Sequence, residues 1–193
     1  MIPQLVLGSQ SPRRAELLKA LALDFRQISS DIDESYPANL KGAEVSDFIA
    51  LAKAESLKNQ LAPNELLICS DTIVCLEDRV LGKPRDLSEA KAMLHSLSGR
   101  SHTVHSSICF SDKVKSICLH DSTAVYFKEL SSSEVDYYIE TFKPYDKAGA
   151  YGIQEWIGMI GIEKVIGSYF TVMGLPTHLI LPQLKAWRAL PLG

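Results

Sequence analysis

The stretch LVLGSQSPRR, residues 5–14, decides the fold because it joins a short apolar strand to the start of a helix. Residues 5–7 are apolar, as in a buried strand. Ser11 is a favoured residue type just before a helix, and Pro12 is favoured at the first helical position. Apolar residues then recur at helical spacing from Ala15 onward. The stretch therefore predicts a strand–loop–helix unit, which is typical of α/β proteins.

Strand and helix patterns are interleaved along the rest of the chain, with adjacent strands in the middle. A capping box begins at Ser131, and Asp112-Lys113 fits the turn between two adjacent strands. Adjacent strands in the middle of the chain favour a mixed sheet over a purely parallel one. We therefore expect an α/β fold with a mixed sheet, formed by a single domain over residues 1–193. The expected strands cover residues 5–7, 25–29, 66–76, 103–110, 116–127 and 159–166, and the strand at residues 66–76 is expected to be interrupted at Ser70-Asp71-Thr72. The expected helices cover residues 12–22, 45–57, 86–97, 131–142 and 179–190.

Composition and charge narrow the class of protein. The chain has 193 residues, 46% of them apolar, and its 20 basic and 23 acidic residues give a net charge of −3. These values exclude a disordered or fibrous chain, and the acidic balance argues against a nucleic-acid polymer as partner. No apolar run reaches the roughly 18 residues of a membrane span, and the first residues do not resemble a signal peptide. The four cysteines form no Cys-x-x-Cys pair, which favours a reducing compartment, so we expect a cytoplasmic protein. Because the sequence contains neither a membrane span nor the charge of a nucleic-acid binder, we expect no membrane partner and a small molecule as ligand.

The loop at residues 9–14 has the chemistry of a phosphate site. Unpaired N–H groups at a helix start attract anions, and the hydroxyls of Ser9 and Ser11 add further donors. Arg13 and Arg14 lie in the first turn, where the helix dipole disfavours cations unless an anion is bound there. Guanidinium groups bind phosphate oxygens in a bidentate manner. The alternative is a capped surface helix with two solvated arginines.

Asp71 places a carboxylate inside an apolar run. Asp is depleted in strands, and a carboxylate in such a place must be paired, bound to a metal or displayed in a cleft. In a regular strand Thr72 would face the opposite side. The alternative is an aspartate at a strand end or bulge that is bonded to nearby backbone amides.

Other charged residues could complete a site around Asp71. A carboxylate from the acidic stretch 31–34, together with Asp71, could hold Mg²⁺ beside phosphate oxygens. Lys53 lies among alanines and Lys83 follows a glycine, so both could project toward a ligand. Taken alone, each of these residues is more typical of a solvated surface.

The stretch DKAGAYGIQ, residues 146–154, is rich in small residues and turns. Its glycines would let a planar ligand approach the backbone, and the Gln154 amide could read the edge of a base. A purely structural loop is the alternative. The five histidines show no metal-ligand spacing, and we interpret them as structural or surface residues.

Taken in order, these motifs resemble the Maf family of nucleoside triphosphate pyrophosphatases. The matches run from about Leu5 to Pro176 and so cover almost the whole chain. Each motif alone is weak, but the ordered set is specific. The matching residues are Ser9, Ser11, Pro12, Arg13 and Arg14, then Ala50, Lys53 and Ala54, and then residues 70–74, 83–86, 97–99, 102–104, 146–154, 167–169 and 174–176.

The resemblance implies a fold related to that of inosine triphosphate pyrophosphatases, with two lobes around a central cleft. It implies hydrolysis of a nucleoside triphosphate to the monophosphate and pyrophosphate, which cleans the nucleotide pool. Arg13, Thr72 and Gln154 resemble the branch that acts on dTTP and UTP, with modified pyrimidine nucleotides as further substrates. Gly8 and Glu155-Trp156 depart from the family pattern, in which Ala and a smaller pair are commoner, so the finer base preference stays open.

The resemblance also implies roles for single residues. Asp71 and Glu34 would hold Mg²⁺ or Mn²⁺, and Asp71 would accept the proton of the attacking water. Lys53 and Lys83 would be catalytic and, together with the loop at residues 9–14, would neutralise the phosphates. A homodimer is expected from the family.

Two other functions are compatible with the sequence. A nucleotide-binding regulator of cell division or septum formation would bind nucleotide without significant turnover. A related purine pyrophosphatase would prefer ITP, although the motif ending in Gln154 disfavours this function.

Overall fold

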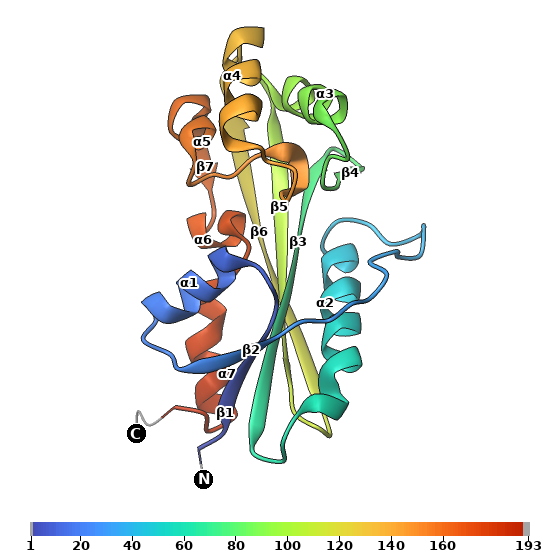
Figure 1. Cartoon of the computed structure of the whole chain (residues 1–193), viewed down its shortest axis with the longest axis vertical. Coiled ribbons are helices and arrows are strands. Elements are labelled where there is room, and N and C mark those ends of the chain that lie inside the picture. Colours follow the sequence, from blue (N-terminus) through green and yellow to red (C-terminus); the bar gives the residue numbers. More distant parts are fainter. Residues whose placement is uncertain (1, 191–193) are drawn as a thin grey trace. The chain divides into compact units, whose positions relative to one another are not determined.

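A computed structural model of the chain describes residues 2–190, so the expected domain limits at residues 1 and 193 lie outside the described residues. Strands and helices are interleaved along the chain, with β4 directly after β3 and β6 directly after β5 (Figure 1). The strands are β1 (Gln4–Gly8), β2 (Phe25–Ile28), β3 (Glu65–Leu76), β4 (Arg79–Leu81), β5 (Ser101–Ser111), β6 (Ser116–Phe127) and β7 (Ile162–Ile166). The helices are α1 (Pro12–Ala20), α2 (Ala43–Leu57), α3 (Leu87–Leu97), α4 (Ser132–Phe142), α5 (Trp156–Gly161), α6 (Tyr169–Met173) and α7 (Ile180–Ala186). Three 3₁₀ turns are η1 (Lys58–Gln60), η2 (Ala148–Ala150) and η3 (Thr177–Leu179).

The strands belong to one mixed sheet in the order β2-β1-β3-β5-β6-β7, with β4 paired to β3. β1 runs parallel to β2 and β3, whereas β4 is antiparallel to β3 and β7 is antiparallel to β6. The Asp112 carboxylate accepts hydrogen bonds from the N–H groups of Val114 and Lys115 at 2.7 and 2.8 Å, which forms the predicted turn between β5 and β6. The predicted mixed α/β architecture is therefore confirmed.

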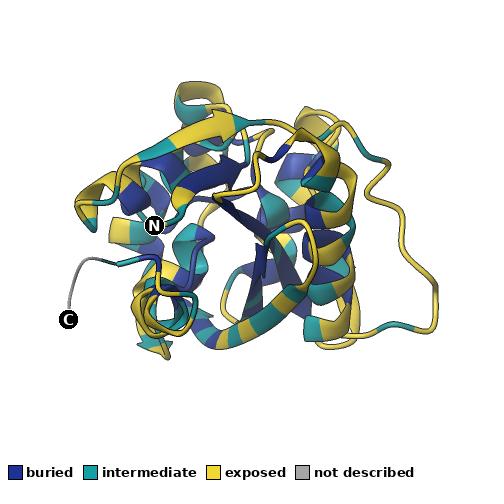
Figure 2. Ribbon diagram, turned by 90° about the horizontal axis from the view of Figure 1, so that it is seen from below, coloured by how far each residue is buried: buried dark blue, intermediate teal, exposed yellow. Residues whose placement is uncertain are grey.

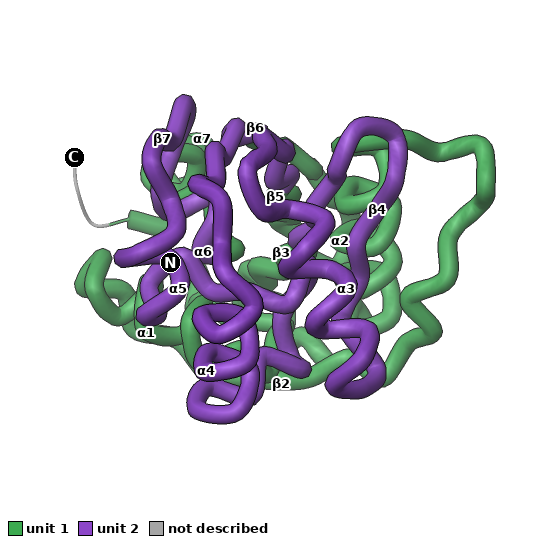
Figure 3. Tube along the Cα trace, turned by 90° about the horizontal axis from the view of Figure 1, so that it is seen from above, with its two compact units in different colours: residues 1–71, 106–121, 174–193 green, residues 72–105, 122–173 purple. Residues whose placement is uncertain are grey.

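The chain divides into two compact units (Figure 3). Unit 1 contains residues 1–71, 106–121 and 174–193, and unit 2 contains residues 72–105 and 122–173. The division falls within β3, β5 and β6, so each of these strands contributes residues to both units. The single domain and the central cleft stay predictions.

Each unit has its own apolar core. In unit 1, Ala50 and Leu57 of α2 pack with Val6 of β1. In unit 2, Leu94 of α3 and Tyr138 of α4 lie in one buried cluster with residues of β3, β5 and β6. Figure 2 shows this burial as dark blue along the strands and on the inner sides of the helices. Burial of one apolar stripe per helix agrees with the periodicity that predicted these helices.

The structure corrects the expected interruption of β3. The strand continues through Ser70, Asp71 and Thr72 because the Asp71 carboxylate finds a charged partner without leaving its strand position. Two short elements, β4 and α6, are absent from the sequence-based expectations because three and five residues are too few to show a period.

Three other expected boundaries were wrong. The expected strand at residues 159–166 begins only at Ile162, because residues 156–161 form α5. The helix α1 ends at Ala20 since Ala22 has a φ of 55°, which a right-handed helix excludes. The closing helix ends at Ala186 for the same reason, since Arg188 has a φ of 53°.

Gly158 of α5 gives the packing of unit 2 a direct test. A Cβ at this position would lie 1.9 Å from the carbonyl oxygen of Ile153. Gly158→Ala is therefore expected to lower the free energy of unfolding by about 3 kcal/mol, the upper end of typical overpacking costs. Urea denaturation measures this loss. Gly82→Ala is the matched control because a Cβ at Gly82 would meet nothing within 4 Å, and equal stability of the two variants would contradict the packing argument.

Within residues 2–190, no helix has the length and apolar character needed to cross a membrane. Cys69, Cys75, Cys109 and Cys118 are free thiols, and the first three are buried. They therefore contribute to packing as small apolar side chains.

Candidate functional site

Unit 1 places three predicted site residues in direct contact. Asp71 lies on β3, Lys53 on α2, and Glu34 in the segment that precedes α2. The Lys53 Nζ lies 2.7 Å from Asp71 Oδ1 and 2.7 Å from Glu34 Oε1. The side chains of Lys53 and Asp71 are only 12% and 10% exposed, whereas that of Glu34 is 43% exposed. One lysine thus joins a buried carboxylate to a half-exposed one.

The position of Lys53 follows from the packing of α2. Ala50 and Ala54 are fully buried on the helix side that faces the core of unit 1. Their small side chains let the helix backbone approach the strands, so the lysine next to Ala54 reaches β3. The alanines around Lys53 were the signal for this placement in the sequence.

Asp71 has the chemistry of a proton acceptor. Burial raises the pKa of Asp71 above its usual value, while the Lys53 ammonium and the Arg14 guanidinium lower it, and the net result is a raised pKa. A carboxylate with a raised pKa is a stronger base than an exposed aspartate. A perturbed carboxylate with specific charged partners is also a common property of functional sites.

The loop between β1 and α1 is organised around Ser9. Ser9 Oγ accepts hydrogen bonds from the N–H of Ser11 at 3.2 Å and from Arg14 Nη1 at 3.3 Å. Ser11 occupies the position before α1 but makes no capping bond with its side chain, which corrects the expected cap. Arg13 follows Pro12 in the first turn of α1 and is half-buried. The serine hydroxyl and the arginines therefore gather at one helix start, as the phosphate prediction requires.

Ser70 and Gly174, which the sequence did not assign to the site, support this loop. Arg14 Nε donates to the carbonyl oxygen of Gly174 at 2.9 Å, and Ser70 Oγ donates to the same oxygen at 3.1 Å. Gly174 has a φ of 105°, which favours glycine. Burial lowers the pKa of Arg14, and the charge of Asp71 opposes this effect. In the sequence, the signals that could have assigned these two residues to the site were the adjacency of Ser70 to Asp71 and the motif that begins at Gly174.

The carboxylates of Asp71 and Glu34 are oxygen ligands of the kind that Mg²⁺ takes. Both already contact one cationic group, the Lys53 ammonium. Mg²⁺ is usually bound by one or two carboxylates together with substrate phosphates. Among residues 2–190, no group of three or more His, Cys, Asp or Glu residues is arranged to hold a metal ion, so phosphate oxygens would have to supply further ligands.

Unit 2 carries the other predicted residues. Thr72 follows Asp71 on β3 and is half-buried, as is Gln154 in the turn after η2. The N–H of Gly149 donates to the carbonyl oxygen of Gly82 at 3.0 Å, which joins the segment before Lys83 to the segment of residues 146–154. Thus Lys83 and the Gln154 segment are connected within unit 2.

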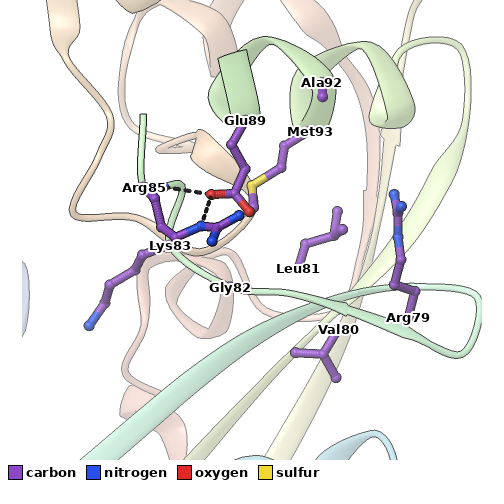
Figure 4. A pocket seen from close by; sticks show the side chains of 9 residues that line it. All are labelled: Arg79, Val80, Leu81, Gly82, Lys83, Arg85, Glu89, Ala92 and Met93. Carbon is purple, nitrogen blue, oxygen red and sulfur yellow. Dashed lines mark hydrogen bonds and ion pairs between the residues drawn. The ribbon is translucent and has the colours of Figure 1, made fainter. Parts of the chain in front are cut away.

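Lys83 lines a pocket of about 410 Å³ in unit 2. Arg85 also lines this pocket, and Glu89 accepts from its backbone N–H at 2.7 Å and from its Nε at 3.0 Å. Figure 4 shows that the Lys83 side chain points away from Glu89. The lining residues are Arg79, Val80, Leu81, Gly82, Lys83, Arg85, Glu89, Ala92 and Met93.

Three of the five histidines make hydrogen bonds within the protein. His102 is buried, its Nε2 lies 2.7 Å from the hydroxyl of Tyr151, and burial lowers its pKa to about 4. His105 and His120 are hydrogen-bonded to Ser122 and Asp47. These contacts agree with the interpretation of the histidines as structural or surface residues.

Comparison with known proteins matches this chain to one family over nearly its whole length. The family described as Maf-like protein matches residues 4–187. A protein of Christiangramia forsetii named dTTP/UTP pyrophosphatase is 47% identical, covering 94% of this chain and 93% of that protein. Proteins of the same name from Parabacteroides distasonis and Porphyromonas gingivalis are 48% identical, covering 94% of this chain and 95% and 93% of those proteins. Among solved structures, a nucleoside-triphosphatase / dITP/XTP pyrophosphatase from Mycobacterium abscessus aligns over 97% of this chain and 98% of its own, with 12% identity and a TM-score of 0.45.

Proposed function

The chain belongs to the Maf-like protein family, and we propose that it hydrolyses dTTP and UTP to the nucleoside monophosphate and pyrophosphate. The observation that carries this proposal is the buried contact between Asp71 and Lys53, which provides a proton acceptor beside a fixed cation. Relatives named dTTP/UTP pyrophosphatase, 47% and 48% identical over more than nine tenths of both chains, support the substrate class. The proposed substrates include modified pyrimidine triphosphates. By hydrolysing them, the enzyme would remove damaged or unwanted nucleotides from the pool.

In this proposal, Asp71 removes the proton from the attacking water. Lys53 stabilises the negative charge that develops on the phosphates, since a positioned cation is most effective where charge grows in the transition state. The Ser9 hydroxyl and the Arg13 and Arg14 guanidinium groups hold the triphosphate at the start of α1. The Ser11 N–H keeps the Ser9 hydroxyl in place.

Residues of unit 2 complete the proposed chemistry. Lys83 adds a positive charge to the binding of the phosphates. Thr72 and Gln154, together with Arg13 of unit 1, set the base preference. The support for these three roles is the resemblance of their motifs, and for Gln154 also the capacity of an amide to donate and accept at a base edge.

Asp71 and Glu34 would hold the divalent metal, which we propose to be Mg²⁺ or Mn²⁺. When bound, the metal would neutralise phosphate charge. Lys53, already between the two carboxylates, keeps their charges compensated before the nucleotide arrives.

A substrate panel tests the proposed function. With Mg²⁺ or Mn²⁺, the chain is expected to release pyrophosphate from UTP and dTTP with a kcat/KM about tenfold or more above that for ITP, a ratio that the net worth of about one hydrogen bond to the base supplies. Chelation of the metal is expected to abolish the reaction. Binding of UTP without pyrophosphate release would instead support the regulator, and preference for ITP would support the purine pyrophosphatase.

We also propose that the chain works as a homodimer in the cytoplasm. The free thiols support a reducing compartment, because disulfides persist mainly in oxidising ones. The dimer rests on the family resemblance.

A further inference from the structure

The turn that carries Gln154 is closed by a ring of hydrogen bonds. The N–H of Glu155 donates to the carbonyl oxygen of Gly152 at 3.0 Å, so Gln154 is the third residue of a hydrogen-bonded β-turn. The N–H of Gly152 donates to the hydroxyl of Tyr138 at 3.1 Å, and this hydroxyl donates to Glu155 Oε2. Both ends of the turn are therefore bonded to one tyrosine.

The Glu155 carboxylate faces the interior of unit 2. Glu155 occupies the position before α5, yet it makes no capping bond there. Its Oε1 lies 3.0 Å from the Nζ of Lys147, whose side chain is only 9% exposed and also contacts Asp146 at 2.7 Å. The interior thus supplies the carboxylate with both a cation and a hydroxyl donor.

Tyr138 is a rigid anchor for this arrangement. It is fully buried on α4, which begins with the predicted capping box at Ser131. Burial and the Glu155 carboxylate raise the pKa of Tyr138, so the hydroxyl stays protonated and keeps donating. The turn is consequently tied to a helix that packs in the core of unit 2.

The Gln154 and Glu155 side chains lie against the same glycine. A Cβ at Gly152 would meet Glu155 Cδ at 2.9 Å and Gln154 Nε2 at 3.2 Å. In the part of the chain that the structure describes, no hydrogen bond fixes the Gln154 amide, whereas the preceding Ile153 is buried in the core. The placement of Gln154 therefore follows from the turn and not from a hydrogen bond to its own amide.

We propose that Glu155 is a positioning residue for base recognition, which with Tyr138 and Lys147 fixes the turn that presents Gln154 and so sets the preference for uracil and thymine over cytosine. This inference rests on the proposed function, in which Gln154 contacts the base. Thymine and uracil present a carbonyl acceptor where cytosine presents an amino donor. An amide that carries both a donor and an acceptor separates these bases only when its orientation is fixed. The departure from the family pattern at Glu155 thereby acquires a role.

The test compares kcat/KM for UTP with kcat/KM for CTP, both from pyrophosphate release by the full chain. Glu155→Ala is expected to lower this ratio about tenfold, which is the net effect of about one hydrogen bond. Glu155→Gln keeps an acceptor for Tyr138 and is expected to retain most of the ratio. Glu140→Ala removes an exposed carboxylate from α4 and serves as the matched control with an unchanged ratio. Loss of folded protein lowers both values by the same factor and leaves the ratio unchanged.

The variant Gln154→Ala separates the inference from the function on which it rests. In the Gln154→Ala background, Glu155→Ala is expected to change the ratio no further, because both substitutions remove the same fixed amide. If Gln154→Ala lowers the ratio and Glu155→Ala does not, the inference is wrong while the role of Gln154 stands. If Gln154→Ala leaves the ratio unchanged, both the role of Gln154 in base recognition and the inference about Glu155 are wrong.

A binding measurement tests the inference if the wild-type chain has no pyrophosphatase activity. If the wild-type chain releases no pyrophosphate from UTP, the proposed reaction fails. The ratio of Kd values for α,β-methylene-UTP and α,β-methylene-CTP then tests the inference without turnover. A tenfold smaller preference for the uracil analogue in Glu155→Ala supports the positioning role, and an unchanged preference overturns it.

Discussion

Asp71→Asn is expected to lower kcat for pyrophosphate release from UTP by about 10²–10⁴-fold, the usual loss when a positioned base is removed. Asn keeps the size of the side chain and its place on β3, but its amide cannot take the proton of water at neutral pH. In the wild-type chain the rate should fall as the pH drops through the raised pKa of Asp71. This acid limb should be absent from the profile of the variant.

The stability of Asp71→Asn distinguishes lost chemistry from lost structure. Because the folded-state pKa of Asp71 is raised, its contribution to stability is present below the unfolded pKa and is lost as the pH rises through the folded pKa. At pH 7 the charged form is therefore a net cost in the folded state, and Asn should not lower the unfolding midpoint in urea. Asp24→Asn, at an exposed position of unit 1, is the control that should keep full activity. Near wild-type turnover of Asp71→Asn would exclude Asp71 as the base.

Lys53→Met is expected to lower kcat by about 10²–10³-fold, the loss typical when one group that stabilises transition-state charge is removed. The change also leaves the carboxylates of Asp71 and Glu34 without the cation between them. Since the Lys53 ammonium lowers the pKa of Asp71, its removal should raise that pKa further. The acid limb of the pH–rate profile should consequently move to higher pH.

Lys58→Met is the matched control for this variant. Lys58 follows α2 in unit 1 and contacts Glu55 at 2.6 Å, so its loss removes an ion pair outside the candidate site. Its turnover and pH profile should match those of the wild-type chain. An acid limb that stays in place in Lys53→Met would show that the contact with Asp71 has no effect on the reaction.

The sequence predicted best those features that depend on local periodicity. The capping box at Ser131 forms as expected, and β6 has the predicted bounds, because short-range hydrogen bonds and apolar spacing determine both. The boundary of α5 was missed because residues 156–161 are apolar, and such a short run is compatible with either a helix or a strand.

The candidate site was predictable as a set of residues but not as a set of contacts. The isolated charge of Asp71 in an apolar run required a partner, and the structure supplies Lys53. Spacing along the chain does not show that Glu34 would meet the same ammonium, since tertiary packing decides that contact. The bond from Arg14 to Gly174 joins residues 160 positions apart, beyond the reach of any local pattern.

That bond also sets an order of events during protein synthesis. Gly174 accepts from Arg14 of the starting helix and from Ser70 beside the proposed base, so the first and last parts of unit 1 support each other. Translation proceeds at about 5–20 residues per second, and a nascent chain that has passed Asp71 still lacks Gly174 for several seconds. The growing chain on the ribosome therefore carries the proposed base before it can hold its phosphate loop, and the loop gains this support only when translation nears the end of unit 1.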